Sequence, residues 1–357
     1  MAKKSRVFLR GMSSEQYGLS EFRKAQLAAP RVRTDEFVAD DAKVGHSGDS
    51  ADSRTWWRIG PGDDPFLTQN IQVHFVEIPP GKSNHGHGHQ NEAAFYILNG
   101  SGYEIHDDRR YPWSQDDLVV VHTDSVHRHF NDGTETAKAL VMKAKSTWMY
   151  FGLIQQGRSG PIEDEDRFGP RVDWSDVWTE GVEDRVKVVK PADTVWETTR
   201  DGRVRVLCSK DTPHVRVFSV DVYEQEIAPG SRSAKHWHMP DEVAYVIAGS
   251  GESLQWEVEA EIAERYYARV AKEPTRWEFK ADETVYVPQN HQHQYVNTGD
   301  EPLRLLVVQN RLIKYLGYDA VAYLEEAPEY SEQAAAVTAG CRRRSGSSPA
   351  TGVGSTR

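Results

Sequence analysis

The chain has 357 residues, of which 38% are hydrophobic and 27% charged, a composition typical of one large or two ordinary soluble domains. Its formal net charge of −11 argues against a nucleic-acid-binding protein, which needs clustered lysine and arginine, and no apolar run is long enough to predict a membrane span. The N-terminus lacks the apolar core of a signal peptide and only two cysteines occur, Cys208 and Cys341, so we expect a cytoplasmic protein whose metal chemistry, if any, uses histidine and carboxylate.

In chain order, the sequence predicts an N-terminal arm over residues 1–50 and a first domain over residues 51–160. Runs such as NIQVHFVEI, FYILNGSGYEI and DLVVVHT alternate apolar and polar residues between turn residues, which is typical of antiparallel strands. A stretch rich in glycine, proline and acidic residues predicts a linker over 161–195. A second domain of similar strand patterns follows over 196–325. Residues 326–357 predict a C-terminal segment with a disordered, Ser/Gly-rich tail.

The two predicted domains repeat the same motif. Residues 71–100 align with residues 220–249 at a constant offset of 149, and residues 120–131 align with residues 286–297 at an offset of 166. The larger second offset indicates an insertion in the second copy. The alignment pairs His87 with His236, His89 with His238, and His127 with His293.

The insertion lies in the segment LQWEVEAEIAERYYARVAKEPTRWEF. Its residues Val258, Ile262, Tyr266 and Val270 recur every four positions and Pro274 ends the pattern, which predicts a short amphipathic helix. A long charged hairpin is the alternative interpretation.

The repeated histidines have the spacing of metal ligands. Successive side chains of a strand face opposite sides, so His236 and His238 point the same way and can hold one ion. A third histidine from a distant strand completes a set that leaves positions open for substrate and oxygen, as in non-heme iron oxygenases.

These residues resemble the two-part motif of the cupin superfamily. The second copy reads Gly230-x5-His236-x-His238-x3-Glu242-x6-Gly249, followed by Pro288-x-Asn290-x2-His293-x3-Asn297. The resemblance covers roughly 70–145 and 220–310 and implies an all-β bicupin with two jelly-roll barrels and a few short helices. It also implies that His236, His238, Glu242 and His293 hold a metal.

The first copy departs from the motif at its carboxylate. Ala93 stands where the second copy has Glu242, and Glu92 lies one residue early. Because one step along a strand reverses the face of a side chain, we expect Glu92 to miss the metal. The same frame places His85 in the preceding loop. The first copy is therefore predicted to be a three-histidine site of His87, His89 and His127.

A bicupin with such a three-histidine site resembles gentisate 1,2-dioxygenase and the related salicylate and 1-hydroxy-2-naphthoate dioxygenases. This resemblance implies a non-heme Fe²⁺ enzyme that cleaves the ring of a hydroxylated aromatic acid with O2. The full ligand set of the second copy leaves open which site is catalytic, or whether both are. The alternatives are a quercetin or hydroquinone dioxygenase, a Mn²⁺-dependent decarboxylase or isomerase, or a small-molecule-binding cupin. Oxalate decarboxylase is disfavoured because it should carry glutamate in both copies.

Further residues are candidates for a role near the metals. His129, Asn131 and Asn297 are expected as hydrogen bonders behind the ligands, with a turn role as the alternative for the asparagines. Phe95, Trp237 and Tyr245 are expected to contact an aromatic substrate, with core packing as the alternative. The ligand sets also suit Mn²⁺, Ni²⁺ or Zn²⁺, and the resemblance implies a homodimer or homotetramer.

Overall fold

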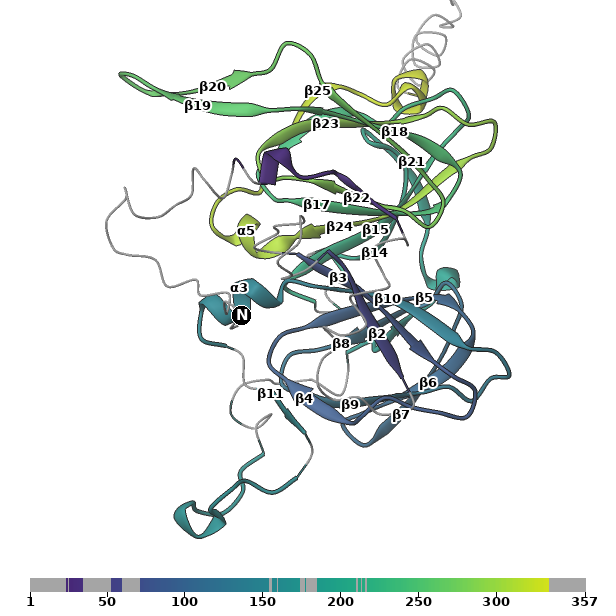
Figure 1. The fold of residues 1–357 in the computed structure, drawn as a ribbon, viewed down its shortest axis with the longest axis vertical. Coiled ribbons are helices and arrows are strands. Elements are labelled where there is room, and N and C mark those ends of the chain that lie inside the picture. Colours follow the sequence, from purple (N-terminus) through teal and green to yellow (C-terminus); the bar gives the residue numbers. More distant parts are fainter. Residues whose placement is uncertain are drawn as a thin grey trace, which may run out of the picture.

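The computed structural model describes residues 24, 26–34, 53–59, 71–153, 156–158, 160–173, 177, 185–209, 211–212, 214–215 and 217–333. Within these residues the chain forms two jelly rolls, one above the other in Figure 1, with a few short helices. The predicted fold class is therefore confirmed. The predicted disordered tail lies mostly outside the described residues. No helix in the described part of the chain is long and apolar enough to cross a membrane.

Domain 1, the lower half of Figure 1, contains a six-stranded and a five-stranded sheet. The six-stranded sheet has the order β12 (Val188–Val189), β8 (Leu118–Val121), β5 (Ala93–Asn99), β10 (Ala137–Lys143), β3 (Gln72–Ile78) and β2 (Arg54–Ile59). The five-stranded sheet has the order β11 (Gln156–Arg158), β4 (His87–His89), β9 (Ser125–Phe130), β6 (Ser101–His106) and β7 (Arg109–Ser114).

Domain 2 repeats this plan with a seven-stranded and a five-stranded sheet. The larger sheet has the order β1 (Val32–Arg33), β22 (Thr284–Val287), β17 (Glu242–Ala248), β24 (Leu303–Asn310), β15 (Val220–Ile227), β14 (Gly202–Cys208) and β13 (Trp196–Thr199). The smaller sheet has the order β21 (Thr275–Lys280), β18 (Ser250–Trp256), β23 (His291–Asn297), β16 (Lys235–His238) and β25 (Ala322–Glu325). The short helices include α3 (Lys145–Tyr150), η3 (Glu165–Arg167), η4 (Pro191–Asp193) and α5 (Arg311–Tyr315).

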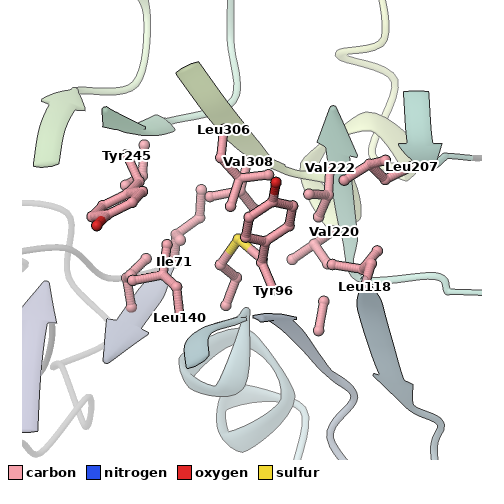
Figure 2. Close-up of a cluster of buried hydrophobic side chains, with 14 of the residues drawn as sticks. Ile71, Tyr96, Leu118, Leu140, Leu207, Val220, Val222, Tyr245, Leu306 and Val308 are labelled. Carbon is pink, nitrogen blue, oxygen red and sulfur yellow. The ribbon is translucent and has the colours of Figure 1, made fainter. Parts of the chain in front are cut away.

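The two larger sheets pack against each other, so their strands are buried on both faces. In β5, Ala93, Phe95 and Ile97 belong to the interior core of domain 1, whereas Ala94 and Tyr96 belong to the core between the domains. A strand covered on both faces needs apolar residues at nearly every position, which explains the continuous apolar runs of this sheet. Figure 2 shows part of the core between the domains, with Ile71, Tyr96, Leu118 and Leu140 from domain 1 and Val222, Tyr245, Leu306 and Val308 from domain 2.

Two segments that the sequence places outside the domains each add a strand to one of them. β1, from the predicted arm, pairs with β22 of domain 2 through Val32 and Val285. β12, from the predicted linker, pairs with β8 of domain 1 through Val188 and Val119. In Figure 1 the purple β1 accordingly lies among the green strands of domain 2.

The insertion of domain 2 is a hairpin, so the helix prediction was wrong and the alternative interpretation was correct. β19 (Val258–Ile262) pairs with β20 (Tyr266–Val270) and the hairpin projects away from domain 2 in Figure 1. Val258 lies opposite Val270, and Ile262 lies opposite Tyr266. Residues spaced by four also share one face of a strand, because four is a multiple of the strand period of two. The spacing therefore fitted both structures.

Candidate metal centres

Four buried side chains of domain 2 converge between its two sheets. His236 and His238 lie on β16, His293 lies opposite His236 on β23, and Glu242 begins β17. One ligand atom from each lies within 4.8 Å of those from the others. The structure thus brings together the four residues that the motif selects from segments more than 50 positions apart.

Hydrogen bonds orient two of these rings. His238 Nδ1 donates to the Pro240 carbonyl at 2.9 Å, and His293 Nδ1 lies 3.4 Å from the His291 carbonyl. A carbonyl only accepts, so the proton is on Nδ1 and Nε2 keeps its lone pair for an ion. The Nε2 atoms of His238 and His293 lie 3.3 and 3.4 Å from the Glu242 carboxylate, which faces the same space.

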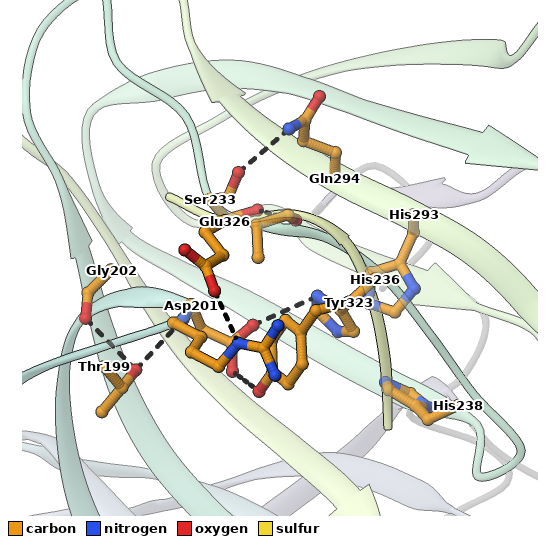
Figure 3. A network of polar contacts seen from close by, with 12 residues as sticks. Thr199, Asp201, Gly202, Ser233, His236, His238, His293, Gln294, Tyr323 and Glu326 are labelled. Atoms are coloured by element: carbon orange, nitrogen blue, oxygen red, sulfur yellow. Dashed lines mark hydrogen bonds and ion pairs between the residues drawn. The ribbon is translucent and has the colours of Figure 1, made fainter. Parts of the chain in front are cut away.

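His236 lies beside a carboxylate that the sequence motif does not include. Its Nδ1 lies 3.2 Å from Asp201 Oδ1, while Asp201 Oδ2 accepts a hydrogen bond from Tyr323 at 2.7 Å. Figure 3 shows Asp201 between these two side chains, with His238 and His293 beyond. Burial raises the pKa of Asp201 to about 6, although Tyr323 acts in the opposite direction. Asp201 precedes β14 and lies outside both repeated blocks, so no motif signals it.

Glu242 sits in a shell of neutral donors. Its carboxylate accepts hydrogen bonds from Tyr295 at 2.8 Å, from Gln309 at 2.7 Å and, more weakly, from Tyr223 at 3.4 Å. Burial by itself would raise the pKa of Glu242, but the adjacent His293 and His238 hold that pKa well below its ordinary value. An ionised carboxylate among imidazole rings is a donor set that suits a divalent cation.

Domain 1 brings together three histidines at the equivalent place. His87 and His89 lie on β4 and His127 lies opposite His87 on β9, with ring centroids 4.5 to 5.4 Å apart. One nitrogen from each lies within 4.8 Å of the others. His87 Nδ1 donates to the His85 carbonyl at 2.9 Å, which leaves its Nε2 free. His85 itself lies outside this group, and its backbone serves to orient the neighbouring ring.

The domain 1 histidines fit a metal on electrostatic grounds as well. Burial lowers the pKa of His87 and lowers those of His89 and His127 well below the ordinary range, so the rings are neutral. Both ring nitrogens of His127 are buried without a hydrogen-bond partner among the described residues. Buried polar atoms seldom lack partners, and a bound ion would satisfy one of them.

Glu92 faces away from these histidines. Its carboxylate accepts hydrogen bonds from the backbone N–H groups of Phe218 and Ser219 at 2.8 to 3.1 Å, and from the Ser219 hydroxyl at 2.8 Å. Glu92 therefore links domain 1 to a segment of domain 2, and Ala93 is the residue of β5 that stands at the position of Glu242.

The candidate asparagines hold turns. The Asn131 side chain donates to the carbonyls of Ile78 and Glu135, both at 2.7 Å, and accepts from Gly133 N at 2.9 Å. Asn297 makes the equivalent three bonds in domain 2. All of these partners are backbone groups, so the suggested role behind the metal ligands is corrected to a turn role.

His129 and Phe95 both face the interior of domain 1. Their rings lie 4.3 Å apart, and the His129 ring lies 5.4 Å from that of His127. Both residues line a small apolar cavity of about 20 Å³. His129 Nδ1 also lies 3.6 Å from the buried carboxylate of Glu104, a residue that the sequence reading did not select.

Trp237 and Tyr245 lie on the wrong faces for the predicted substrate contact. Trp237 alternates with the ligands on β16 and donates a hydrogen bond to Asn290 at 2.9 Å. Tyr245 lies three residues after Glu242, in the core between the domains, and its hydroxyl donates to Asp282 at 2.7 Å. β17 is buried on both faces, so its apolar pattern could not show which face meets the metal, whereas on β16 only the histidine face is buried.

Comparison with known proteins agrees with this architecture. Residues 74–143 and 223–309 match the family model of the cupin domain. Auxin-binding protein 1 of Arabidopsis thaliana is 33% identical over 92 residues, 26% of this chain and 42% of that protein. The 1-hydroxy-2-naphthoate 1,2-dioxygenase of Nocardioides sp. (strain KP7) is 23% identical over 203 residues, 52% of each chain. The chain thus spans about half the length of these relatives.

Solved structures of similar fold include two variants of the oxalate decarboxylase of Bacillus subtilis. One superposes with a TM-score of 0.55 at 14% identity, covering 83% of this chain and 80% of the other. The second has a TM-score of 0.52 at 15% identity, covering 80% and 78%. At such identities the likeness concerns the fold. With its two matched cupin domains and this two-jelly-roll fold, the chain is a bicupin of the cupin superfamily.

Proposed function

We propose that this bicupin is a metal-dependent dioxygenase that cleaves the ring of a hydroxylated aromatic acid with O2. The observation that carries the proposal is the three-histidine group of domain 1, with Ala93 at the carboxylate position. The similarity to 1-hydroxy-2-naphthoate 1,2-dioxygenase, which extends over 203 residues, supports the same chemistry. The proposed partners are a small aromatic acid and O2, within a homodimer or homotetramer.

The proposed metal ligands are His87, His89 and His127 in domain 1. When bound there, Fe²⁺ supplies the redox chemistry that allows O2 to react with a chelated aromatic substrate. The protein contributes three neutral rings, and Ala93 provides no carboxylate at the position of Glu242. Mn²⁺, Ni²⁺ and Zn²⁺ suit the same nitrogen donors and are the alternatives to test.

The second proposed metal site is that of His236, His238, Glu242 and His293 in domain 2. Its donor set and the fold shared with oxalate decarboxylase favour a second candidate function, a Mn²⁺-dependent decarboxylation of a small carboxylic acid. The two proposed sites differ by one glutamate, because domain 2 has Glu242 where domain 1 has Ala93. This difference distinguishes the two candidate functions.

Oxygen uptake tests the proposed function. The Fe²⁺-loaded protein is assayed with gentisate, salicylate, 1-hydroxy-2-naphthoate, hydroquinone and quercetin, and the Mn²⁺-loaded protein is assayed for CO2 release from oxalate. We expect uptake with at least one of the aromatic acids. No uptake across the panel at full metal occupancy would refute the dioxygenase, and CO2 release from oxalate would favour the second candidate.

Two matched variants assign the catalytic domain. His127→Ala removes the proposed ligand on β9 of domain 1, and His293→Ala removes the equivalent ligand on β23 of domain 2. Each variant leaves the site of the other domain intact. We expect each to lose about half of the bound metal, measured by elemental analysis, and only His127→Ala to abolish oxygen uptake. Full activity in His127→Ala would assign domain 1 a structural role.

A further inference from the structure

Lys143 of domain 1 is buried at the position where domain 2 has Gln309, a hydrogen-bond donor to the carboxylate of Glu242. In domain 2, Glu242 of β17 is paired with Gln309 of β24, and the Gln309 amide donates to the carboxylate at 2.7 Å. In domain 1, Met142 of β10 is paired with Ala94 of β5, so the next residues, Lys143 and Ala93, are the equivalent pair. The offsets of the repeat give the same correspondence. A glutamate and a glutamine have thus been replaced by an alanine and a lysine.

Lys143 is enclosed but has no anionic partner. It is 7% exposed, and within the described residues its ammonium has no hydrogen bond or ion pair. The Trp57 ring lies beside it, with its centroid 5.9 Å from Nζ. Burial, with a further contribution from Lys145, lowers the pKa of Lys143 to about 7. A buried ammonium without a counter-charge is costly, so such a residue is usually paired.

The surroundings of Lys143 are those of the domain 1 metal ligands. Lys143 shares the face of β10 that carries Ala139 and Val141, both in the interior core of domain 1, and its positive charge contributes to lowering the pKa of His87 and of His89. The two neutral donors that accompany Gln309 around Glu242 are replaced as well, since Tyr223 corresponds to His74 and Tyr295 to His129. All three donors to the carboxylate of domain 2 therefore correspond to basic residue types around Ala93 in domain 1.

We propose that Lys143, beside Ala93 in the pairing of β10 with β5, forms an anion subsite next to the domain 1 histidines, and that this subsite takes the carboxylate of an aromatic acid. The proposal rests on the proposed function for the identity of its occupant. The substrate carboxylate supplies the negative charge that Glu242 supplies in domain 2, and the Lys143 ammonium donates to it. An aromatic acid is thereby selected over an uncharged phenol of the same shape.

Calorimetric titration with a matched pair of ligands tests the subsite. The full chain is loaded with redox-inactive Zn²⁺, in a His293→Ala background that restricts binding to domain 1, and is titrated with salicylate and with salicylamide. We expect salicylate to bind more tightly than its uncharged amide. In Lys143→Gln, which installs the residue of domain 2, salicylate affinity falls about tenfold or more, the range for hydrogen bonds to charged groups, and salicylamide affinity stays within about twofold.

Two controls make the result specific. Lys82→Gln removes an exposed lysine and leaves both affinities unchanged. Ala93→Glu places a carboxylate beside Lys143 and pairs the ammonium internally, so it abolishes salicylate binding while the zinc content remains. Equal affinity for the two ligands, or an unchanged preference in Lys143→Gln or Ala93→Glu, refutes the subsite. Displacement of salicylate by millimolar phosphate or chloride would show a general anion site and would equally refute the assignment to a carboxylate.

The outcomes also separate this inference from the proposed function. Lys143-dependent salicylate binding without oxygen uptake for any substrate would retain the subsite and reject the dioxygenase. Oxygen uptake whose preference for acids survives Lys143→Gln would retain the dioxygenase and reject the subsite.

Discussion

The ring of His236 has a side-chain carboxylate beside its Nδ1. Backbone carbonyls hold Nδ1 of His238 and His87, whereas the side chain of Asp201 lies beside Nδ1 of His236. A carboxylate in this position raises the basicity of the ring and fixes the nitrogen that faces the ion. Removing it should therefore weaken metal binding without removing a ligand.

Asp201→Ala should lower the metal affinity of domain 2 about 10- to 100-fold. The measurement is a competition titration against a chromogenic chelator, in a His127→Ala background that leaves one site. Asp193→Ala, which removes an exposed carboxylate from the preceding segment, is the control and should change nothing. An affinity within twofold of the parent in Asp201→Ala would show that Asp201 does not support the ligand.

His122 links protonation to stability. It is buried at the end of β8, its Nε2 lies 2.6 Å from the Val215 carbonyl, and burial lowers its pKa to about 3, with Lys187 acting in the same direction. In the unfolded chain the His122 imidazole takes up a proton near pH 6.5, whereas in the folded protein it does so only near pH 3. Its contribution to folding stability is therefore complete above pH 6.5 and is lost as the pH falls toward 3. From pH 7 to pH 5 the metal-free protein should lose about 2 kcal/mol through this group.

His122→Gln tests that contribution, since the amide can still donate to the Val215 carbonyl but does not titrate. Denaturant unfolding at pH 7 and pH 5 should show a drop about 2 kcal/mol smaller in the variant than in the parent. Equal drops in both proteins would show that His122 is not the group responsible.

At the scale of elements, the β19–β20 hairpin contributes little to the folded core. Val258 is buried at its base, whereas Ile262, Tyr266 and Val270 are exposed although they share one face. The free energy gained by burying apolar surface is proportional to the area removed from water. The outer part of this hairpin buries little apolar surface against the rest of the chain, so it should contribute little to stability.

Replacing residues 260–268 with a two-residue Asn-Gly turn should therefore leave the melting temperature within about 2 °C of the parent, because surface changes usually alter stability by less than about 0.5 kcal/mol. The control is Val258→Ala, which removes buried surface at the base and should be more destabilising. A large fall in the melting temperature of the shortened protein would show that the outer part of the hairpin contributes substantially to stability, against this prediction.

At the scale of the whole molecule, the two domains share a buried core where their larger sheets meet, so we expect them to unfold together. The Tyr96 hydroxyl of domain 1 donates to Glu224 of domain 2 at 2.9 Å, and Tyr245 of domain 2 meets Phe75 of domain 1 at 5.9 Å between ring centroids. Tyr96 and Tyr245 are equivalent in the repeat, as are Phe75 and Glu224. Each of the two equivalent tyrosines therefore contacts an equivalent position of the other domain: Tyr96 contacts Glu224, and Tyr245 contacts Phe75.

Leu306→Ala should destabilise the protein by about 2 to 5 kcal/mol, since this leucine is 1% exposed in the core between the domains. Hydrogen exchange should accelerate on β5 of domain 1 as well as on β24 of domain 2, because the lost contact is shared. The control Leu324→Ala removes an exposed side chain. Acceleration confined to domain 2 would show that the domains unfold independently.

The sequence by itself determined the fold class and selected both groups of candidate ligands. Each ligand pair lies within a few residues on one strand, where alternation decides the face, and the repeat supplied a second copy against which Glu92 could be separated from Ala93. The correspondence of Lys143 with Gln309 was also present in the sequence, 12 residues beyond the last aligned block, but nothing local showed that the lysine is buried.

Only the tertiary structure decided what depends on distant chain segments. Tyr245 and Phe95 occupy similar apolar strands, and the packing of one domain on the other determines which face meets the metal ligands. Asp201 reaches His236 from a turn outside the motif, and β1 and β12 join domains from segments that read as connections. The spacing of four in the insertion satisfied a helix and a hairpin equally, and only tertiary contacts select between two conformations that local periodicity allows.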